Sequence, residues 1–278
     1  MTGLGRRLAW GFLLVLLVAA VAAPWLPLVD YRAMDADARL LPPGTPGHLL
    51  GTDAQGRDLL ARLLHGARIS LLVGAVGTLV ALLIGLPYGA VAGLRGGRLD
   101  RLMMRAADAL ESVPLVVVVL FLLSVLREYR VELEGVGFGR LELFLVAIGV
   151  LFWLPTARVA RAETLRLRKL PFVMAARAAG VPWRRLLLRH VLPNLWPTVR
   201  VMWLLTVPRV ILMEAFLSFL GLGVEAPAVS WGGLASDGLA AMNPLVSSWW
   251  LLWLPAAALA ATLLALHRVG RAASDAAP

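Results

Sequence analysis

Six apolar runs, each long enough to cross a lipid bilayer as a helix, constrain the fold of this chain more than any other feature. They cover residues 8–28, 69–94, 102–126, 141–157, 195–220 and 249–266. Spanning the hydrocarbon takes about 20 helical residues, and a helix satisfies its backbone hydrogen bonds internally. Apolar side chains make up 60% of the 278 residues, above the share of a typical soluble domain. The sequence therefore predicts an all-α membrane protein with six transmembrane helices.

The positive charges predict how these helices are oriented. Of the 27 Lys and Arg residues, 17 lie in the segments on one side of the predicted spans and eight on the other. Because Lys and Arg concentrate in cytosolic loops, we expect both termini to be cytosolic. The net charge of +10 thus indicates membrane topology and lipid contact, and no nucleic-acid partner is expected.

The first apolar run leaves one alternative open. Arg6 and Arg7 precede it, and small residues at 20–23 resemble a signal-peptide cleavage site. Pro24 follows directly, and the run continues through Trp25 and Leu26, which favours a retained membrane helix over a cleaved signal.

Several kinds of chemistry are excluded. The chain has no cysteine, and its four histidines (His48, His65, His190 and His267) lack metal-ligand spacing. Its only lysine, Lys169, lies outside any Gly-x4-Gly-Lys-Ser/Thr phosphate loop. We therefore expect no resident metal or cofactor, and no ATP hydrolysis by this chain itself.

A Pro-, Gly- and Asp-rich segment separates the first two runs. Residues 42–47 cannot form a helix or sheet interior, because Pro lacks a donor and Gly is too flexible. Thr52 or Asp53 is predicted to cap a short interfacial helix from Arg57 to His65, whose leucines form one stripe.

Glycines at 85, 89 and 93 recur every four residues in the second run and predict a groove for a neighbouring helix. A neighbour within the same chain is favoured over another subunit.

Charges fall within two of the runs. Arg101, Arg105, Asp108 and Glu111 share one face of the third and predict a salt-bridge ladder near the headgroups. Arg209 and Glu214 lie inside the fifth, five residues apart, so they do not form a simple pair. Either they line a transport pathway or they are buried structural groups.

Residues 158–193 form a basic stretch with nine positive residues and one acid, Glu163. Its Ala-rich and Leu-rich pieces each repeat at helical spacing, so it predicts a cytosolic helix pair that docks a soluble partner. Within it lie Ala175-Ala176, Gly180, His190 and Leu192-Pro193.

That pattern resembles the "EAA" loop of permease subunits of ATP-binding-cassette importers. Further segments are similar to the dipeptide, oligopeptide and nickel permeases: Gly51-Thr-Asp-Ala-Gln-Gly-Arg-Asp58, Gly66-Ala-Arg-Ile-Ser70, Ala157-Arg-Val-Ala-Arg161, Glu214-Ala-Phe-Leu-Ser-Phe-Leu-Gly-Leu-Gly-Val224 and Ser230-Trp231-Gly232. The match runs from about residue 51 to 255 and points to the second permease of the pair. Two features depart from the family: Met174 replaces the Glu that names the motif, and the tail at 267–275 lacks the usual acidic pattern.

The resemblance implies a type I importer permease that moves short peptides, or a related solute such as a nickel chelate. Its implied partners are a homologous second permease, two ATPase subunits and an extracytoplasmic solute-binding protein. The implied divisions are residues 1–68, a 69–268 core with the coupling loop 158–193, and a tail at 269–278. Residues 171–182 are expected to form the coupling helix. The ATPase-docking residues are Met174, Ala175, Ala176, Arg177, Gly180, Leu192 and Pro193, and Arg209 and Glu214 are candidates for the pathway.

The main alternative is an ion-gradient-driven transporter or channel, which predicts inverted repeats that are not found here. An intramembrane enzyme is more distant, because Asp108 and Glu111 suit a surface ladder better than a catalytic dyad. A scaffold leaves the matched segments unexplained.

Overall fold

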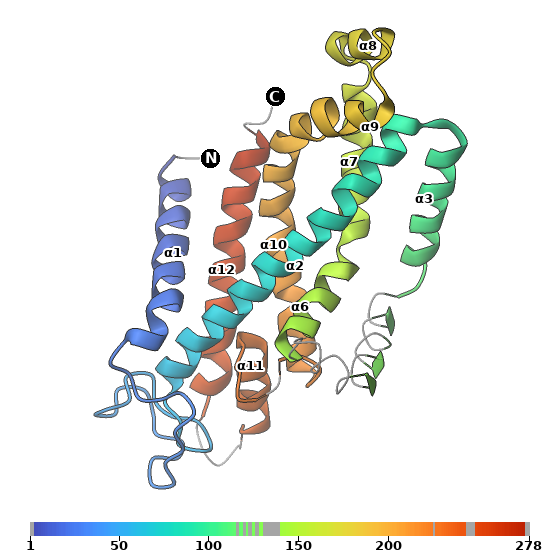
Figure 1. Ribbon diagram of the computed structural model, residues 1–278. Coiled ribbons are helices and arrows are strands. Elements are labelled where there is room, and N and C mark those ends of the chain that lie inside the picture. The colour runs from blue at the N-terminus through green and yellow to red at the C-terminus, as the bar shows by residue number, and fades with distance from the viewer. Residues whose placement is uncertain are drawn as a thin grey trace. The chain divides into compact units, whose positions relative to one another are not determined.

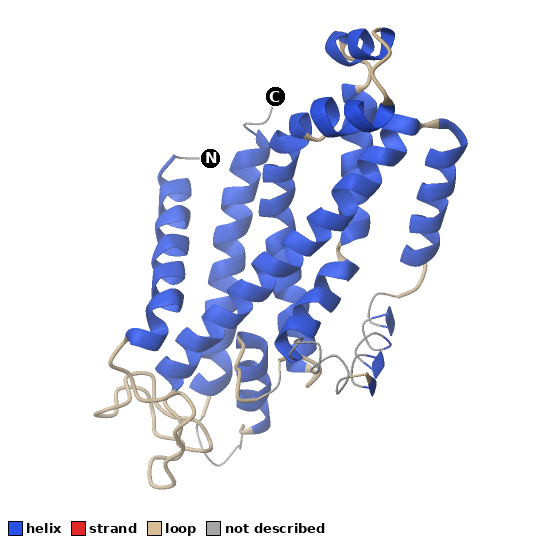
Figure 2. Ribbon diagram, viewed as in Figure 1, coloured by secondary structure: helices blue, strands red, loops and turns tan. Residues whose placement is uncertain are grey.

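The computed structural model describes residues 3–114, 117–118, 121, 124–125, 128–129, 140–224, 226–242 and 248–275. Within these residues the regular structure is helical, apart from two isolated β-bridges (Figure 2). The predicted all-α class is therefore confirmed. In the part of the chain that the structure describes, four helical runs are long and apolar enough to cross a membrane: Leu4–Trp25, Leu59–Arg95, Trp183–Phe219 and Trp250–Ala272. The bent pair Phe144–Leu151 and Trp153–Leu167 adds a fifth if it is one span.

The third predicted span, residues 102–126, lies partly outside the described residues. Helix α3 runs from Gly97 to Glu111 and so begins before the predicted start. Six spans and two cytosolic termini therefore stay predictions.

The chain divides into two compact units. Unit 1 comprises Met1–Ala75 and Pro208–Ala272, and unit 2 comprises Val76–Val207 and Ala273–Pro278. Helices α2 (Leu59–Arg95) and α10 (Trp196–Phe219) each contribute to both units.

Unit 1 is built around an apolar cluster between α1 (Gly3–Ala22), the start of α2, α11 (Trp231–Ala240) and the start of α12 (Trp250–Asp275). Its central side chain is Trp231, whose indole N–H donates to the Leu63 carbonyl at 3.0 Å. Glycines allow α11 to fit closely here, since a Cβ at Gly232 would overlap the Ala215 carbonyl and one at Gly238 the Leu251 carbonyl. A short 3-10 turn, Ala23–Trp25, leads from α1 into the segment 26–58.

The start of α2 differs from the sequence prediction of a separate interfacial helix. Residues 59–65 form the first turns of one continuous 37-residue helix. Gly66 does not end it, since a glycine within a helix costs only about 1 kcal/mol and here faces the Trp231 ring. The predicted cap is also wrong. Asp58 caps α2 by accepting the Ala61 N–H at 2.8 Å, whereas Asp53 forms a turn with Gln55 and Arg57.

Unit 2 contains the rest of α2, α3, α6 (Arg140–Leu151), α7 (Trp153–Leu167) and the basic stretch. The predicted glycine groove is confirmed as packing within the chain, since Gly85, Gly89 and Gly93 all face α7. A Cβ at Gly85 would lie 2.5 Å from the Trp153 carbonyl, and one at Gly89 would overlap the Ala157 carbonyl.

The fourth predicted span, residues 141–157, is broken. Helices α6 and α7 meet at Phe152 with a bend of 43°. Pro155 lacks the N–H that would continue the helical ladder from Leu151, so the chain kinks at this point.

Helix continues from Trp183 to Phe219 through several local geometries. The short helix α9 (Trp183–Leu186) is followed by a π turn (Leu187–Val191), a 3-10 turn (Pro193–Leu195) and α10. The Leu192 N–H donates to the Leu187 carbonyl at 2.9 Å, five residues back. Pro193 has no N–H to donate, and a widened turn just before it absorbs the missing bond.

Candidate functional site

The predicted coupling helix 171–182 corresponds to helix α8, which runs from Pro171 to Ala178 and so ends four residues earlier than predicted. It is visible at the top of Figure 1. Leu170 is extended and Pro171 occupies the first helical position, where a missing N–H costs nothing. The sequence therefore fixes where the helix begins.

A Schellman turn ends α8 at Gly180. The Val181 N–H donates to the Ala176 carbonyl at 3.1 Å, and the Gly180 N–H donates to the Arg177 carbonyl at 3.0 Å. Gly180 has φ of +76°, a conformation that favours glycine. Nothing lies within 4 Å of the position of a Cβ on this residue, so the requirement for glycine is conformational and not steric.

One face of α8 is anchored to the rest of unit 2. Val173 is completely buried in an apolar cluster with Ala90 and Leu94 of α2, Leu167 of α7 and Leu186 of α9. Ala176, Val181 and Leu192 pack against the same cluster.

Two arginines reinforce this junction. Arg95 lies over the Trp183 ring at 4.1 Å, and Arg168 donates to the Gly93 carbonyl at 3.1 Å.

The opposite face of α8 is exposed and mostly apolar. Phe172, Met174, Ala175 and Ala178 are exposed, as is Arg177 beside them. The predicted docking residues thus differ in their exposure to solvent. Met174, Ala175, Arg177 and Gly180 are exposed on α8 and its turn, Ala176 and Leu192 are half-buried, and Pro193 is exposed at the start of the 3-10 turn.

Charged residues of α3 pair with α7 rather than only along their own helix. Arg158 of α7 donates to Asp108 at 2.8 Å and also contacts Glu111. Arg161 holds Asp100 with two hydrogen bonds of 2.5 and 2.7 Å, and these bonds keep the pKa of Asp100 below its ordinary value. The predicted ladder on one helix is therefore, for Asp108 and Glu111, a bridge between two helices.

Glu214 and Arg209 have different surroundings in unit 1. Glu214 is completely buried and accepts hydrogen bonds from Ser70 at 3.0 Å and Ser218 at 2.7 Å. Ser70 in turn accepts the backbone N–H of Trp231 at 3.3 Å, so Glu214 connects α2, α10 and α11. Arg209 is exposed and forms no hydrogen bond or ion pair among the described residues. A charged side chain inside the membrane costs roughly 2.5–3.5 kcal/mol on insertion scales. Arg209 therefore requires an anion or water that the described residues do not supply.

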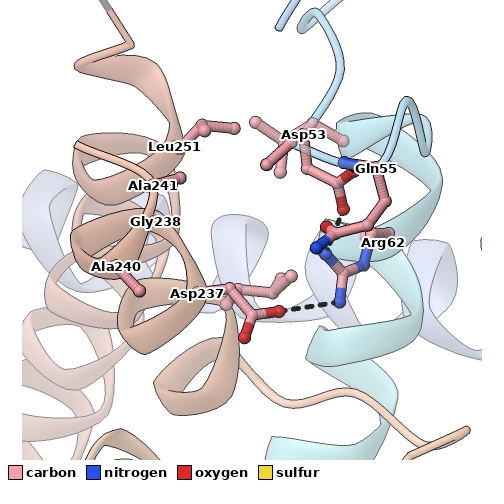
Figure 3. A pocket seen from close by; sticks show the side chains of 11 residues that line it. Asp53, Gln55, Arg62, Asp237, Gly238, Ala240, Ala241 and Leu251 are labelled. Carbon is pink, nitrogen blue, oxygen red and sulfur yellow. Dashed lines mark hydrogen bonds and ion pairs between the residues drawn. The ribbon is translucent and has the colours of Figure 1, made fainter. Parts of the chain in front are cut away.

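A second polar group lies where the segment 26–58 meets α2 and α11, and we call it the Arg62 cluster: Asp53, Arg57, Arg62 and Asp237. Figure 3 shows Arg62 between the two carboxylates. Asp53 is buried and accepts hydrogen bonds from both arginine side chains, the one from Arg57 at 2.7 Å. Arg62 also donates to Asp237 at 3.1 Å, beside a cavity of ≈ 200 Å³.

Turns hold Asp53 in this position. Gly51 and Gly56 have φ of +78° and +76°, and a Cβ on either would overlap a backbone carbonyl, of Leu41 or Asp35 respectively. Thr52 is buried between them and accepts the Leu41 N–H at 2.9 Å. The Gly-Thr-Asp segment thus forms tight turns that place the Asp53 carboxylate against α2.

Comparison with protein families gives one match. The model of the binding-protein-dependent transport system inner membrane component matches residues 85–273, which include α8 and the Glu214 region. The chain belongs to this family.

Curated relatives match beyond those residues. The permease is 41% identical to the oligopeptide transport system permease protein OppC of Haemophilus influenzae over 263 residues, covering 94% of this chain and 80% of the relative. It is 39% identical to the dipeptide transport system permease protein DppC of Bacillus subtilis, covering 95% and 78%. The predicted resemblance to this group is confirmed. The permease is therefore a multi-pass inner-membrane subunit of an ATP-binding-cassette importer, and not an enzyme.

The fold has solved counterparts. An inward-facing structure of the MetNI methionine ABC transporter aligns with a TM-score of 0.56 at 20% identity, covering 76% of this chain and 95% of that one. At this identity the match supports only the fold of the permease and says nothing about its function.

Sequence reasoning missed the partners of the polar groups. Asp53, Ser70, Trp231 and Glu214 were all noticed within matched segments, yet nothing paired Ser70 with Glu214 across 144 residues or Arg62 with Asp237 across 175. The cue was Arg62 itself: an arginine inside an apolar stripe of leucines needs a buried carboxylate.

Proposed function

We propose that the permease carries short peptides across the inner membrane, driven by ATP hydrolysis on separate ATPase subunits that seat α8 in a groove. The observation that carries this proposal is the two-sided character of α8. Its Val173 face is anchored to α2, α7 and α9, while Phe172, Met174 and Ala175 are presented without a partner in unit 2. A helix held on one side and apolar on the other suits a helix-in-groove contact.

The peptide cargo and the other partners are inferred from the relatives. Their printed names are those of oligopeptide and dipeptide transport system permeases. The assembly proposed is this permease, a homologous second permease, two ATPases and an extracytoplasmic solute-binding protein. In it the loop 158–193 is cytosolic, and the segments at 29–68 and 222–248 face the binding protein.

Movement of α8 can be transmitted along the chain to α10, the helix that carries Arg209 and Glu214. The cluster that anchors α8 includes Leu195, which leads into α10, and α10 also carries Arg209 and Glu214. Closure of the ATPases on ATP would shift α8 and α7 together as a rigid lever.

Bulk on the exposed face of α8 tests the docking role. Ala175→Trp is expected to lower ATP-driven peptide uptake about tenfold or more, since a loss of ~1.4 kcal/mol in ATPase binding suffices for a tenfold change. Ala175 is exposed and helical, so the variant should fold and insert. The measurement is uptake and ATPase co-purification of the assembled transporter in proteoliposomes.

The matched control is Ala106→Trp, which adds the same bulk to an exposed position of α3. It should leave uptake unchanged. Full uptake and full ATPase capture by Ala175→Trp would remove α8 as the docking site.

A further inference from the structure

Arg209 lies near the middle of α10. Thirteen residues separate it from Trp196 and ten from Phe219, or about 20 Å and 15 Å of helix. Arg209 is therefore distant from both ends of this apolar helix.

The face of α10 that carries Arg209 is uncovered in unit 1. Leu212, Phe216 and Phe219 follow Arg209 at steps of three, four and three residues, and all four are exposed. Between them, Val210, Ile211, Ala215 and Leu217 are buried and Met213 is half-buried. The result is a narrow stripe with one cation and three large apolar side chains.

This stripe does not suit lipid. Among the described residues Arg209 has no hydrogen bond or ion pair, and a guanidinium cannot lose its charge in a protein. Glu214, the other charged residue of this part of α10, is buried on another face with both oxygens hydrogen-bonded. The stripe must therefore face water or protein that supplies an anion.

We propose that Arg209 binds the C-terminal carboxylate of the peptide in transit, while Leu212 and Phe216 contact its side chains. This inference rests on the proposed peptide cargo. Every unblocked peptide has that carboxylate whatever its sequence, so one fixed cation beside an apolar strip recognises the class without selecting its members. The planar guanidinium binds a carboxylate with two parallel hydrogen bonds, and a water-exposed pair is weak enough to release it.

The first test compares a tripeptide with a free C-terminus and the same tripeptide as its amide, in proteoliposomes containing the whole transporter. Wild type is expected to show a KM up to about fivefold lower for the free acid, the range of a water-exposed ion pair. Arg209→Gln should raise the KM for the acid to that for the amide and leave the amide unchanged. Arg209→Lys should recover part of the preference. Arg200→Gln, on an exposed position of the same helix, is the matched control and should keep it in full.

Other outcomes are decisive. Equal losses for acid and amide, or failure of Arg209→Gln to assemble with its partner subunits, would assign Arg209 to a contact with the companion permease and overturn the proposal. An unchanged preference would overturn it as well. Wild type that moves neither peptide with ATP would instead remove the proposed function itself.

A second test uses the absence of natural cysteine from this chain. Arg209→Cys and Leu212→Cys should both react with 2-aminoethyl methanethiosulfonate, and the free-acid peptide should slow this reaction. Val210→Cys, buried next to them, should stay unreactive. The aminoethyl group restores a cation at position 209, so modification should lower the KM for the acid again. Reaction that the peptide does not slow, with no recovery of KM, would contradict cargo binding.

Discussion

Asp53 illustrates how single residues set the stability of this permease. Its carboxylate is buried, and its two oxygens accept hydrogen bonds from two backbone N–H groups and from the side chains of Arg57 and Arg62. A buried charge with so many partners is well satisfied, but removing one member leaves another charge unpaired. Asp237, at the other end of the cluster, is 54% exposed and loses less on isolation.

We therefore expect Asp53→Ala to lower the free energy of unfolding by about 3–5 kcal/mol, because Arg62 stays buried without its main partner. Asp237→Ala should cost less than about 1 kcal/mol, as for an exposed ion pair. Thermal unfolding of the purified permease in detergent measures both. Equal losses from the two variants would show that Asp53 is not the anchor of the Arg62 cluster.

At the scale of elements, the close contact of α2 with α7 depends on backbone meeting backbone. Gly85, Gly89 and Gly93 present no side chain, so the carbonyls of Trp153, Ala157 and Arg161 approach α2 directly. Small residues at such crossings bring helices close enough for dispersion contacts to hold them together.

Gly89→Ala tests this contact, because its Cβ would overlap the Ala157 carbonyl and force the helices apart. We expect a loss of about 1–3 kcal/mol of stability, the range for overpacking. Gly11→Ala in α1 is the matched control, since nothing lies within 4 Å of its Cβ and alanine favours helix. The readout is the thermal midpoint in detergent, and a loss for Gly11→Ala equal to that for Gly89→Ala would contradict the packing explanation.

Helices whose positions are set by residues close to one another in the sequence could be predicted from the sequence. The apolar runs predicted the first, second, fifth and sixth long helices, and the predicted coupling helix 171–182 begins at Pro171 but ends at Ala178, before the Gly180 turn. Pro155 was a local signal for the break at Phe152. The fusion of residues 59–65 into α2 had no such signal, because it depends on packing against the distant Trp231. The pairing of Glu214 with Ser70 was equally out of reach, since no local pattern reveals a contact across 144 residues.

At the scale of the whole molecule, the distribution of positive charges predicts which side of the membrane each loop faces. With the N-terminus in the cytosol, 17 of the 27 positive residues are cytosolic, provided that residues 102–126 form the predicted third span. Without that span, every later segment would change sides and the basic stretch would face outwards, against the positive-inside tendency.

Single cysteines on this naturally cysteine-free chain decide between the two topologies. Met34→Cys and Tyr129→Cys, at exposed positions before α2 and after α3, should react with a membrane-impermeant maleimide in intact spheroplasts. Arg177→Cys on α8 should react only after permeabilisation, because the loop 158–193 is cytosolic in the six-span arrangement. The unsubstituted chain is the control and should stay unlabelled. If Tyr129→Cys is protected while Arg177→Cys reacts from outside, the third span is missing, and an ATPase in the cytosol has no access to α8.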